Sequence, residues 1–312
     1  MALFLVTGGC GFIGSHLAVA LVARGHTVRI IDDLSTGRRE HAPAGAEVII
    51  GDITDPACLA LGMDGVDGCF HLAAIASVQR SVEDWRRTNA VNLAGTIGVF
   101  DVARRARGGR PVPVVYASSA AVYGDNIDVP LAETAATRPR SAYGVDKLAC
   151  ELHARIATEV HGVPTTGLRF FNVYGPRQDR RSPYSGVISV FYDRLSRGQP
   201  IEIHGDGRQM RDFVYVDDVV TFLLAAMSTA ATADAPRVYN TCTGVGTSVE
   251  ELARTIAELC GTELQVERCP PRPGDIRVSV GDPGRARAEL GCMATVSVRQ
   301  GLERMMAYDA AA

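Results

Sequence analysis

The chain opens with an apolar run that gives way to helical periodicity across a glycine-rich turn. Residues 3–7 are apolar or β-branched, Gly8, Gly11 and Gly14 follow, and an amphipathic pattern runs over 17–22. This pattern predicts a strand, a tight turn and a helix. Gly8 allows a sharp turn, Gly11 lets the backbone approach a pyrophosphate, and Gly14 lets the helix pack closely on the strand.

A second strand pattern over 27–31 ends in Asp32. In a dinucleotide-binding fold, a carboxylate at this place accepts hydrogen bonds from the adenosine ribose hydroxyls, and the N-terminus of the preceding helix binds the phosphates. Because a carboxylate also repels a 2′-phosphate, the sequence favours NAD over NADP. Arg38 and Arg39 are close enough in the sequence to leave NADP open.

Further strand patterns over 47–50, 66–72 and 112–117 alternate with helical ones. This alternation predicts an α/β protein in which a doubly wound parallel sheet, the NAD-binding domain, spans residues 1–171. Residues 172–312 are expected to form a smaller α/β lobe that binds the substrate, with part of 212–244 returning to the large domain. Since no low-complexity linker separates the two parts, the boundary is soft.

Small and polar residues follow the strand patterns at the carboxyl edge of the sheet, where open α/β sheets bind ligands. Asp52 and Ile53 suit an adenine, although Asp52 or Thr54 also fits as the cap of the next helix. His71 is expected to support its loop rather than to do chemistry. Asn92, on an otherwise apolar helix face, needs a polar partner and is a candidate to hold these loops or the cofactor.

Three polar residues after the 112–117 strand are candidates for catalysis. Tyr143 and Lys147 are four residues apart on one helical face, so the ammonium favours the phenolate that a general base requires. A Tyr-x-x-x-Lys pattern alone is more often an exposed pair. Here the Tyr-x-x-x-Lys pattern follows a complete dinucleotide-binding half. Ser119, at the end of a strand, lies between that half and the pattern. This context favours the catalytic interpretation.

The composition narrows the function classes. A chain of 312 residues, 46% of them hydrophobic, can form one large or two coupled domains, and a net charge of −3 with a pI near 6.2 does not suggest a nucleic acid or an anionic membrane as partner. There is no basic leader and no apolar run of membrane-spanning length, so a soluble, cytoplasmic protein is expected. The eight cysteines lack CxxC or metal-site spacing, so reduced thiols and no metal site are expected.

Motifs along nearly the whole chain occur in a recognisable order. They are TGGCGFIG at 7–14, DDLSTG at 32–37, GDI at 51–53, HLAA at 71–74, Ser118-Ser119, Tyr143-x-x-x-Lys147, RFFNVYGPR at 169–177, GDG at 205–207 with RDF at 211–213, and RPGD at 272–275. On these motifs the chain resembles the extended short-chain dehydrogenases/reductases of the NAD-dependent nucleotide-sugar epimerase/dehydratase family. Within that family it is most similar to UDP-hexose 4-epimerases.

The resemblance implies a Rossmann-type fold, NAD as cofactor and a homodimer joined through the helices of residues 85–106 and 144–160. Together with the residue patterns, it gives a set of expected cofactor-binding residues. They are Gly8, Gly11, Phe12, Ile13, Gly14, Asp32, Asp33, Leu34, Ser35, Thr36, Gly37, Asp52, Ile53, Leu72, Ala73, Ala74, Asn92, Tyr143, Lys147 and Phe171.

The resemblance also implies how a UDP-sugar is bound. Asn172 matches a residue that contacts the substrate pyrophosphate, and Arg211 and Arg272 match a pair that clamps it, since a planar guanidinium suits phosphate oxygens. Asp275 matches a ligand of the nucleotide ribose. Gly186 and Val187 match backbone that approaches the uridine, and Ser119 is expected to bind the sugar 4-oxygen. For each arginine alone, a surface ion pair is the commoner explanation.

The reaction implied is 4-epimerisation through a transient 4-keto sugar with return of the hydride. Relatives that eliminate water or decarboxylate carry acidic residues where this chain has Ala120 and Ala121, so those reactions are disfavoured. The alternatives are a 4,6-dehydratase, a 5-epimerase, a 4-ketoreductase or, least favoured, a non-catalytic NAD-binding protein. Some relatives also have a lysine near the nicotinamide where this chain has Ala76.

Ser279 occupies a position that controls access to the sugar pocket in related epimerases. A bulky tyrosine there excludes N-acetyl groups, whereas a small residue admits them. The expectation is activity on UDP-GlcNAc/UDP-GalNAc as well as on UDP-Glc/UDP-Gal.

Overall fold

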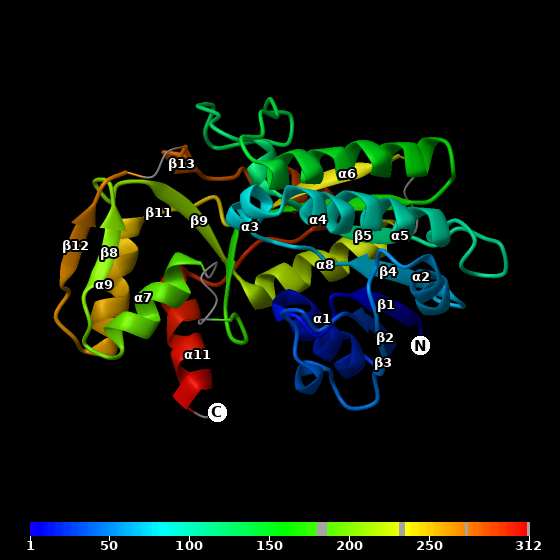
Figure 1. The fold of residues 1–312 in the computed structure, drawn as a ribbon, viewed down its shortest axis with the longest axis horizontal. Helices are drawn as coiled ribbons and strands as arrows, with labels where there is room; N and C mark the ends of the chain where they lie inside the picture. Colours follow the sequence, from blue (N-terminus) through cyan, green and yellow to red (C-terminus); the bar gives the residue numbers. More distant parts are fainter. Residues whose placement is uncertain (180–185, 231–234, 272–273, 311–312) are drawn as a thin grey trace.

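The computed structural model describes residues 1–179, 186–230, 235–271 and 274–310. Its largest element is a seven-stranded sheet in the order β10-β6-β5-β4-β1-β2-β3, in which every neighbouring pair is parallel (Figure 1). The strands are β1 (Leu3–Thr7), β2 (Thr27–Asp32), β3 (Glu47–Ile50), β4 (Gly68–His71), β5 (Val114–Ser119), β6 (Thr165–Phe170) and β10 (Arg237–Thr241). The predicted doubly wound parallel sheet is confirmed.

Helices cover both faces of this sheet because alternate residues of each strand point to opposite sides. Val6 and Ile30 lie in one hydrophobic core, and Leu5 and Ile31 lie in the other. The first core contains α1 (Phe12–Ala23) and α8 (Val216–Ala230), and the second contains α2 (Pro56–Met63), α5 (Gly95–Ala103) and α6 (Ala142–Glu159). Full burial of a side chain of this size stabilises the fold by roughly 1.5–3 kcal/mol, so the two cores hold the helices on the sheet.

The helical pattern after β4 forms an interrupted helix. The short helix α3 (Val78–Glu83) precedes α4 (Trp85–Asn89), which continues through a π-helical turn at Ala90–Ala94 into α5. Single π turns inside helices are frequent at functional sites, and this one contains Asn92.

The smaller lobe is built on two short sheets (Figure 1, left). One pairs β9 (Met210–Tyr215) with β7 (Asn172–Tyr174), β11 (Gly246–Ser248) and β13 (Val278–Ser279), and the other pairs β8 (Ile201–His204) with β12 (Val266–Cys269). A third hydrophobic core joins them to α7 (Val187–Leu195), α9 (Val249–Cys260) and α11 (Val298–Ala310). Helix α10 (Gly284–Leu290) packs beside β10.

The chain passes between the two parts more than once. Strand β9 belongs to the smaller sheet, and the helix that follows it directly, α8, covers the large one. Strand β10 then lies at the edge of the large sheet before β11 returns to the smaller one. The division into domains 1–171 and 172–312 stays a proposal, with α8 and β10 as the segments that return.

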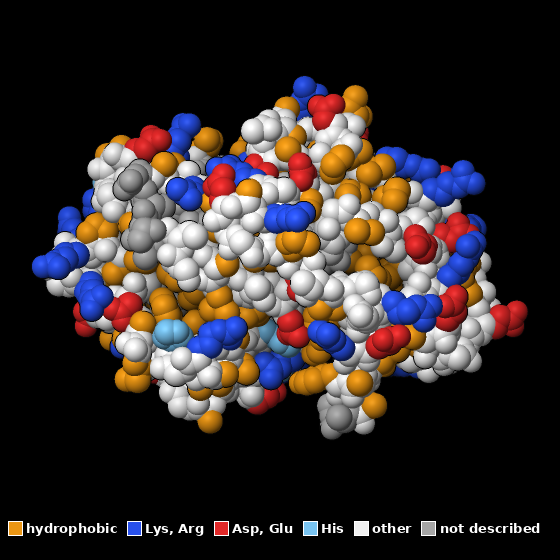
Figure 2. Space-filling model, turned by 180° about the vertical axis from the view of Figure 1, so that it is seen from behind, with side chains coloured by type: hydrophobic (Ala, Val, Ile, Leu, Met, Phe, Trp, Pro, Cys, Tyr) orange, Lys and Arg blue, Asp and Glu red, His pale blue; other side chains and the backbone are white. Residues whose placement is uncertain are grey.

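In the described part of the chain, none of the helices combines the length and apolar character of a membrane span. On the face shown in Figure 2, Lys and Arg side chains are interspersed with Asp and Glu.

Candidate active site

The glycine turn between β1 and α1 has no room for side chains. Gly8 has a φ of +71°, and a Cβ there would lie 2.8 Å from the backbone nitrogen of Ala73. At Gly14 a Cβ would lie 2.1 Å from the carbonyl oxygen of Gly8. Helix α1 begins after Gly11, and none of the described side chains caps it. Its first N–H groups and its dipole are therefore available to an anion.

The carboxylate of Asp32 is fixed at the end of β2. Its oxygens accept hydrogen bonds from the backbone N–H groups of Cys10 (2.9 Å) and Leu34 (2.9 Å). Burial raises the pKa of Asp32, and the hydrogen bonds from the backbone N–H donors offset part of this rise. A Cβ at Gly37 would lie 2.8 Å from Asp32 Oδ1. Gly37 therefore lets the following loop pass close to the carboxylate.

Asp52 does not cap the helix after β3. Helix α2 is capped by Asp55, which accepts a hydrogen bond from the N–H of Ala57 (2.9 Å). The expected cap is therefore three residues too early if it is Asp52 and one residue too early if it is Thr54. Asp52 instead accepts from the N–H of Thr54 (2.8 Å) and from Arg87 (2.7 Å).

His71 and Asn92 support the loop that follows β4. His71 bonds Thr7 Oγ1 (2.7 Å) and Thr96 Oγ1 (2.9 Å), and burial, together with the charge of Lys147, lowers its pKa to about 3. Asn92 is fully buried, accepts from the N–H of Ile75 (2.8 Å) and donates to the carbonyl of Ile75 (3.1 Å). The sequence left two roles open for Asn92, and in the structure Asn92 holds the loop.

Ser119, Tyr143 and Lys147 come together at the carboxyl end of β5. Ser119 ends that strand, and Tyr143 and Lys147 lie in the first turns of α6, whose cap is Ser141 (3.1 Å to the N–H of Gly144). Lys147 is buried, donates to the carbonyl of Ala117 (2.8 Å), and has its Nζ 5.8 Å from the centre of the Tyr143 ring. The predicted proximity of the pair is thus present.

A buried ion pair lies one helical turn further along α6. Glu151, two helical turns after Tyr143, binds Arg169 of β6 through both carboxylate oxygens (2.8 and 2.7 Å) and accepts from the hydroxyl of Ser118 (2.6 Å). The side chains of Arg169 and Glu151 are only 7% and 8% exposed. This contact joins α6 to β5 and β6. Sequence reasoning missed Glu151, although its spacing of eight residues from Tyr143 places it on the same helical face.

A cavity of about 530 Å³ joins these groups. The predicted residues that line it are Gly8, Gly11, Phe12, Ile13, Gly14, Asp32, Asp33, Ser35, Thr36, Asp52, Ile53, Leu72, Ala73, Ala74, Ser119, Tyr143, Lys147, Phe171, Asn172 and Gly186. Leu34, Gly37 and Asn92 are described residues that do not line it. Arg80 and Arg87 also line it, and nothing in the sequence pattern marked them. Gln178 lines it as well. The glycine turn, the Asp32 carboxylate and the Tyr143–Lys147 pair therefore open into one space.

A second cavity, of about 270 Å³, lies in the smaller lobe. Asn172 lines both cavities, and Val187, Arg211 and Asp275 line the second. Arg211 donates to Asp275 (2.6 Å) and to the carbonyl of Ile276 (2.7 Å). The ion pair that the sequence offered as an alternative role for Arg211 is therefore present, and both of its residues line this cavity.

A further predicted substrate residue, Ser279, lies in the smaller sheet. Ser279 pairs with Arg211 in the ladder between β13 and β9 and is not one of the described residues that line either cavity. Arg272 lies outside the described residues.

A parallel sheet whose glycine turn and strand ends open into a deep cavity, with a second lobe beside it, defines a dinucleotide-dependent α/β enzyme class. A model of the "NAD dependent epimerase/dehydratase family" matches residues 4–242, and the chain belongs to that family. NAD is accordingly the cofactor.

Individual relatives agree with this assignment. The chain is 37% identical to a UDP-glucose 4-epimerase of Mycolicibacterium smegmatis over 97% of each chain. A UDP-glucose 4-epimerase of Thermotoga maritima, solved with UDP-glucose, has a TM-score of 0.93 at 35% identity and 99% coverage of both chains. A UDP-N-acetylglucosamine 4-epimerase of Methanobrevibacter ruminantium, in complex with UDP-N-acetylmuramic acid, has a TM-score of 0.90 at 32% identity, with 98% of this chain and 99% of that chain covered.

Proposed function

We propose that this protein is an NAD-dependent UDP-hexose 4-epimerase. The observation that carries the proposal is the single cavity in which Ser119, Tyr143 and Lys147 face the glycine turn. The relatives named above are 4-epimerases, and one of them acts on an N-acetylated sugar nucleotide.

The residues present fit NAD. The close approach at Gly8 and Gly14 leaves space that a Cβ would fill, which suits a pyrophosphate lying against the backbone. Asp32 stands where an adenosine ribose is bound, and Asp52 and Ile53 line the same cavity. When bound, NAD supplies reversible hydride acceptance from a carbon that bears a hydroxyl.

Polar side chains of the protein then carry out the proton transfer. We assign Tyr143 as the base that takes the proton of the sugar 4-hydroxyl and later returns it. Lys147, buried and close to the Tyr143 ring, stabilises the phenolate by its charge. Ser119 holds the same sugar oxygen by a hydrogen bond. Because the loop continues with Ala120 and Ala121, it carries no side chain that removes a second proton, which favours epimerisation over dehydration.

The UDP portion is assigned to the second cavity. Asn172 lines both cavities and suits the pyrophosphate that passes between them. Arg211, Asp275 and Val187, which line this cavity, are proposed to bind the nucleotide, together with Gly186, which precedes Val187 and lines the first cavity. Binding of the pyrophosphate at Arg211 requires its pair with Asp275 to open or to be shared.

We also propose a homodimer formed through helices α4, α5 and α6, which are neighbours in the fold (Figure 1). Exposed apolar surface marks interaction sites. The large apolar side chains that these helices expose are Trp85, Ile97, Val145, Leu152 and Ile156.

The test is to incubate the purified protein separately with UDP-Glc and UDP-GlcNAc, without added reductant, and to resolve the products by chromatography and NMR. We expect the 4-epimer of each, with a loss of about a thousandfold or more in Tyr143→Phe, since general base catalysis contributes 10²–10⁴-fold. A 4-keto product or net accumulation of reduced cofactor would instead favour a dehydratase or a ketoreductase. Full activity of Tyr143→Phe would refute the assigned base.

A further inference from the structure

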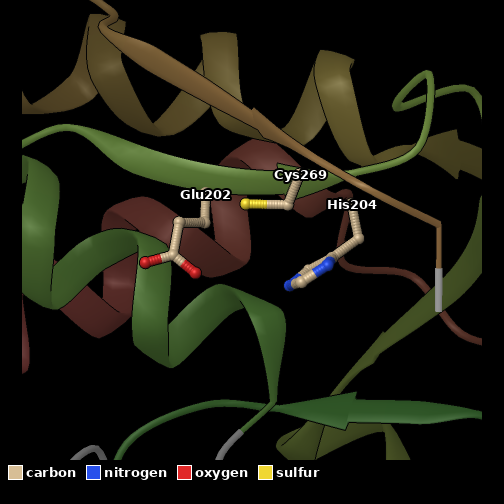
Figure 3. Close-up of side chains that lie close together, drawn as sticks. All are labelled: Glu202, His204 and Cys269. Carbon is tan, nitrogen blue, oxygen red and sulfur yellow. The ribbon is translucent and has the colours of Figure 1, made fainter.

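Three side chains with metal-binding atoms gather on one side of the β8–β12 pair. These two strands are parallel, and His204 stands directly opposite Cys269. Glu202 precedes His204 by two residues, so both side chains point to the same face of the strand. The carboxylate oxygen, an imidazole nitrogen and the Cys269 sulfur all lie within 4.8 Å of one another (Figure 3).

The imidazole of His204 is already oriented for metal binding. Its Nδ1 lies 3.1 Å from the carbonyl oxygen of Pro270, which can only accept a hydrogen bond. Nδ1 is therefore the donor in this contact, and Nε2 is the ring nitrogen that can bind a metal. Metal-binding histidines commonly make this contact from the ring nitrogen that does not bind the metal.

We propose that Glu202, His204 and Cys269 form a binding site for Zn²⁺ or a cation of similar chemistry. Zinc prefers thiolate, imidazole and carboxylate ligands, and three protein ligands leave a fourth position for water. Ligand atoms on a tetrahedral zinc ion are separated by about 3.5 Å, so small side-chain rotations bring these three atoms into range.

One neighbouring charge competes with the cation. Arg194 of α7 lies 3.2 Å from Glu202 Oε1, and both side chains are more than one-third exposed. An exposed pair of this kind contributes only about 0–1 kcal/mol, and it engages one of the two carboxylate oxygens. A cation bound to a thiolate and an imidazole outweighs it.

The site lies in the wall of the second cavity. Glu202 and His204 line that cavity together with Arg211 and Asp275, whereas Cys269 does not. Because a nucleotide in that cavity would also lie against Glu202 and His204, we infer that a bound cation and a bound nucleotide exclude each other. This second step rests on the proposed function, because it takes the nucleotide to be bound in that cavity.

The experiment is a Co²⁺ titration of the untagged, reduced, chelator-treated protein with its NAD, followed by absorption spectroscopy. Cobalt takes the place of zinc and reports a thiolate ligand by a charge-transfer band. We expect one Co²⁺ per chain, displaced by Zn²⁺. Cys269→Ser and His204→Gln are expected to weaken binding roughly tenfold or more, and the serine variant to lose the band. Cys260→Ser, a half-buried cysteine of the same lobe, is the matched control and should keep it.

A titration without a saturable band, or a band that survives in Cys269→Ser, would overturn the metal site. The exclusion is tested by adding UDP, which we expect to release the cobalt. If UDP binds the metal-free protein calorimetrically yet leaves the cobalt band unchanged, the exclusion is wrong. If UDP does not bind the metal-free protein, the proposed function is what fails, and the cobalt band still decides the metal site.

Discussion

At the scale of single residues, burial decides what the polar groups of the site can do. His71 is enclosed between two hydroxyls and stays neutral, so it orients the loop after β4 and carries no charge. Lys147 is buried as well, but a carbonyl oxygen and the Tyr143 ring compensate its charge.

The buried His71 predicts a loss of stability in acid. Its pKa is about 3 in the folded protein and about 6.5 in an unfolded chain, so below pH 6.5 the unfolded state binds the proton and gains free energy. The stability is present above pH 6.5 and is lost as the pH falls toward 3. Between pH 7 and pH 5 the wild type should lose about 2 kcal/mol more than His71→Asn. Urea unfolding at both pH values measures this difference, and equal losses would contradict it.

Ser279 carries a prediction about substrate choice. Ser279 is not one of the described residues that line either cavity, but it pairs with Arg211, which lines the second. We propose that the larger side chain of Ser279→Tyr reaches the sugar. It should then lower kcat/KM for UDP-GlcNAc by roughly tenfold or more and leave that for UDP-Glc nearly unchanged, because only the N-acetyl group would meet the added ring. Ser279→Ala is the control and should keep both activities. Turnover of UDP-Glc alone by the wild type, unchanged in the tyrosine variant, would refute this role.

At the scale of elements, helix α6 carries the reacting side chains and is fixed to the sheet by an ion pair with β6. Tyr143, Lys147 and Glu151 recur every four residues along one face. The first two reach the cavity, and the third is tied to Arg169 of β6. The helix is thus held to the sheet one turn beyond the catalytic pair.

Loss of the ion pair between Glu151 and Arg169 should destabilise the folded protein strongly. In Glu151→Ala the guanidinium of Arg169 stays buried without its carboxylate, which typically costs about 3–5 kcal/mol. Glu159→Ala, the same change at an exposed position of α6, should stay within about 0.5 kcal/mol of the wild type. Urea unfolding of the two variants makes the comparison, and a difference below about 1 kcal/mol would contradict the structural role.

At the scale of the whole molecule, the exposed apolar side chains of α4, α5 and α6 lie on neighbouring helices and are proposed to be covered by a second copy. Leu152→Asp, on α6, would place a charge in that contact and is expected to shift the protein to monomers. Leu61→Asp, on α2, changes a leucine that is also exposed and should stay dimeric. Light scattering distinguishes the two states. A wild type that is monomeric throughout would refute the dimer.

Local patterns in the sequence determined the order of the elements and much of the site. Strand and helix periodicity, the three glycines and Asp32 act within a few residues of one another, and the parallel sheet then brings successive strand ends to one edge. Ser119, Tyr143 and Lys147 could be found in this way because their spacing and place after a strand carry the information.

Tertiary structure alone decided the contacts between distant segments. The sequence left open whether Asn92 holds its loop, and it placed the cap of α2 one to three residues early. It did not reveal that Glu151 meets Arg169 or that Arg211 pairs with Asp275. It also gave no sign that Glu202 and His204 lie near Cys269, since these residues come together only where β8 pairs with β12. The physical reason is that such contacts depend on long-range strand pairing and helix packing, which no local spacing records.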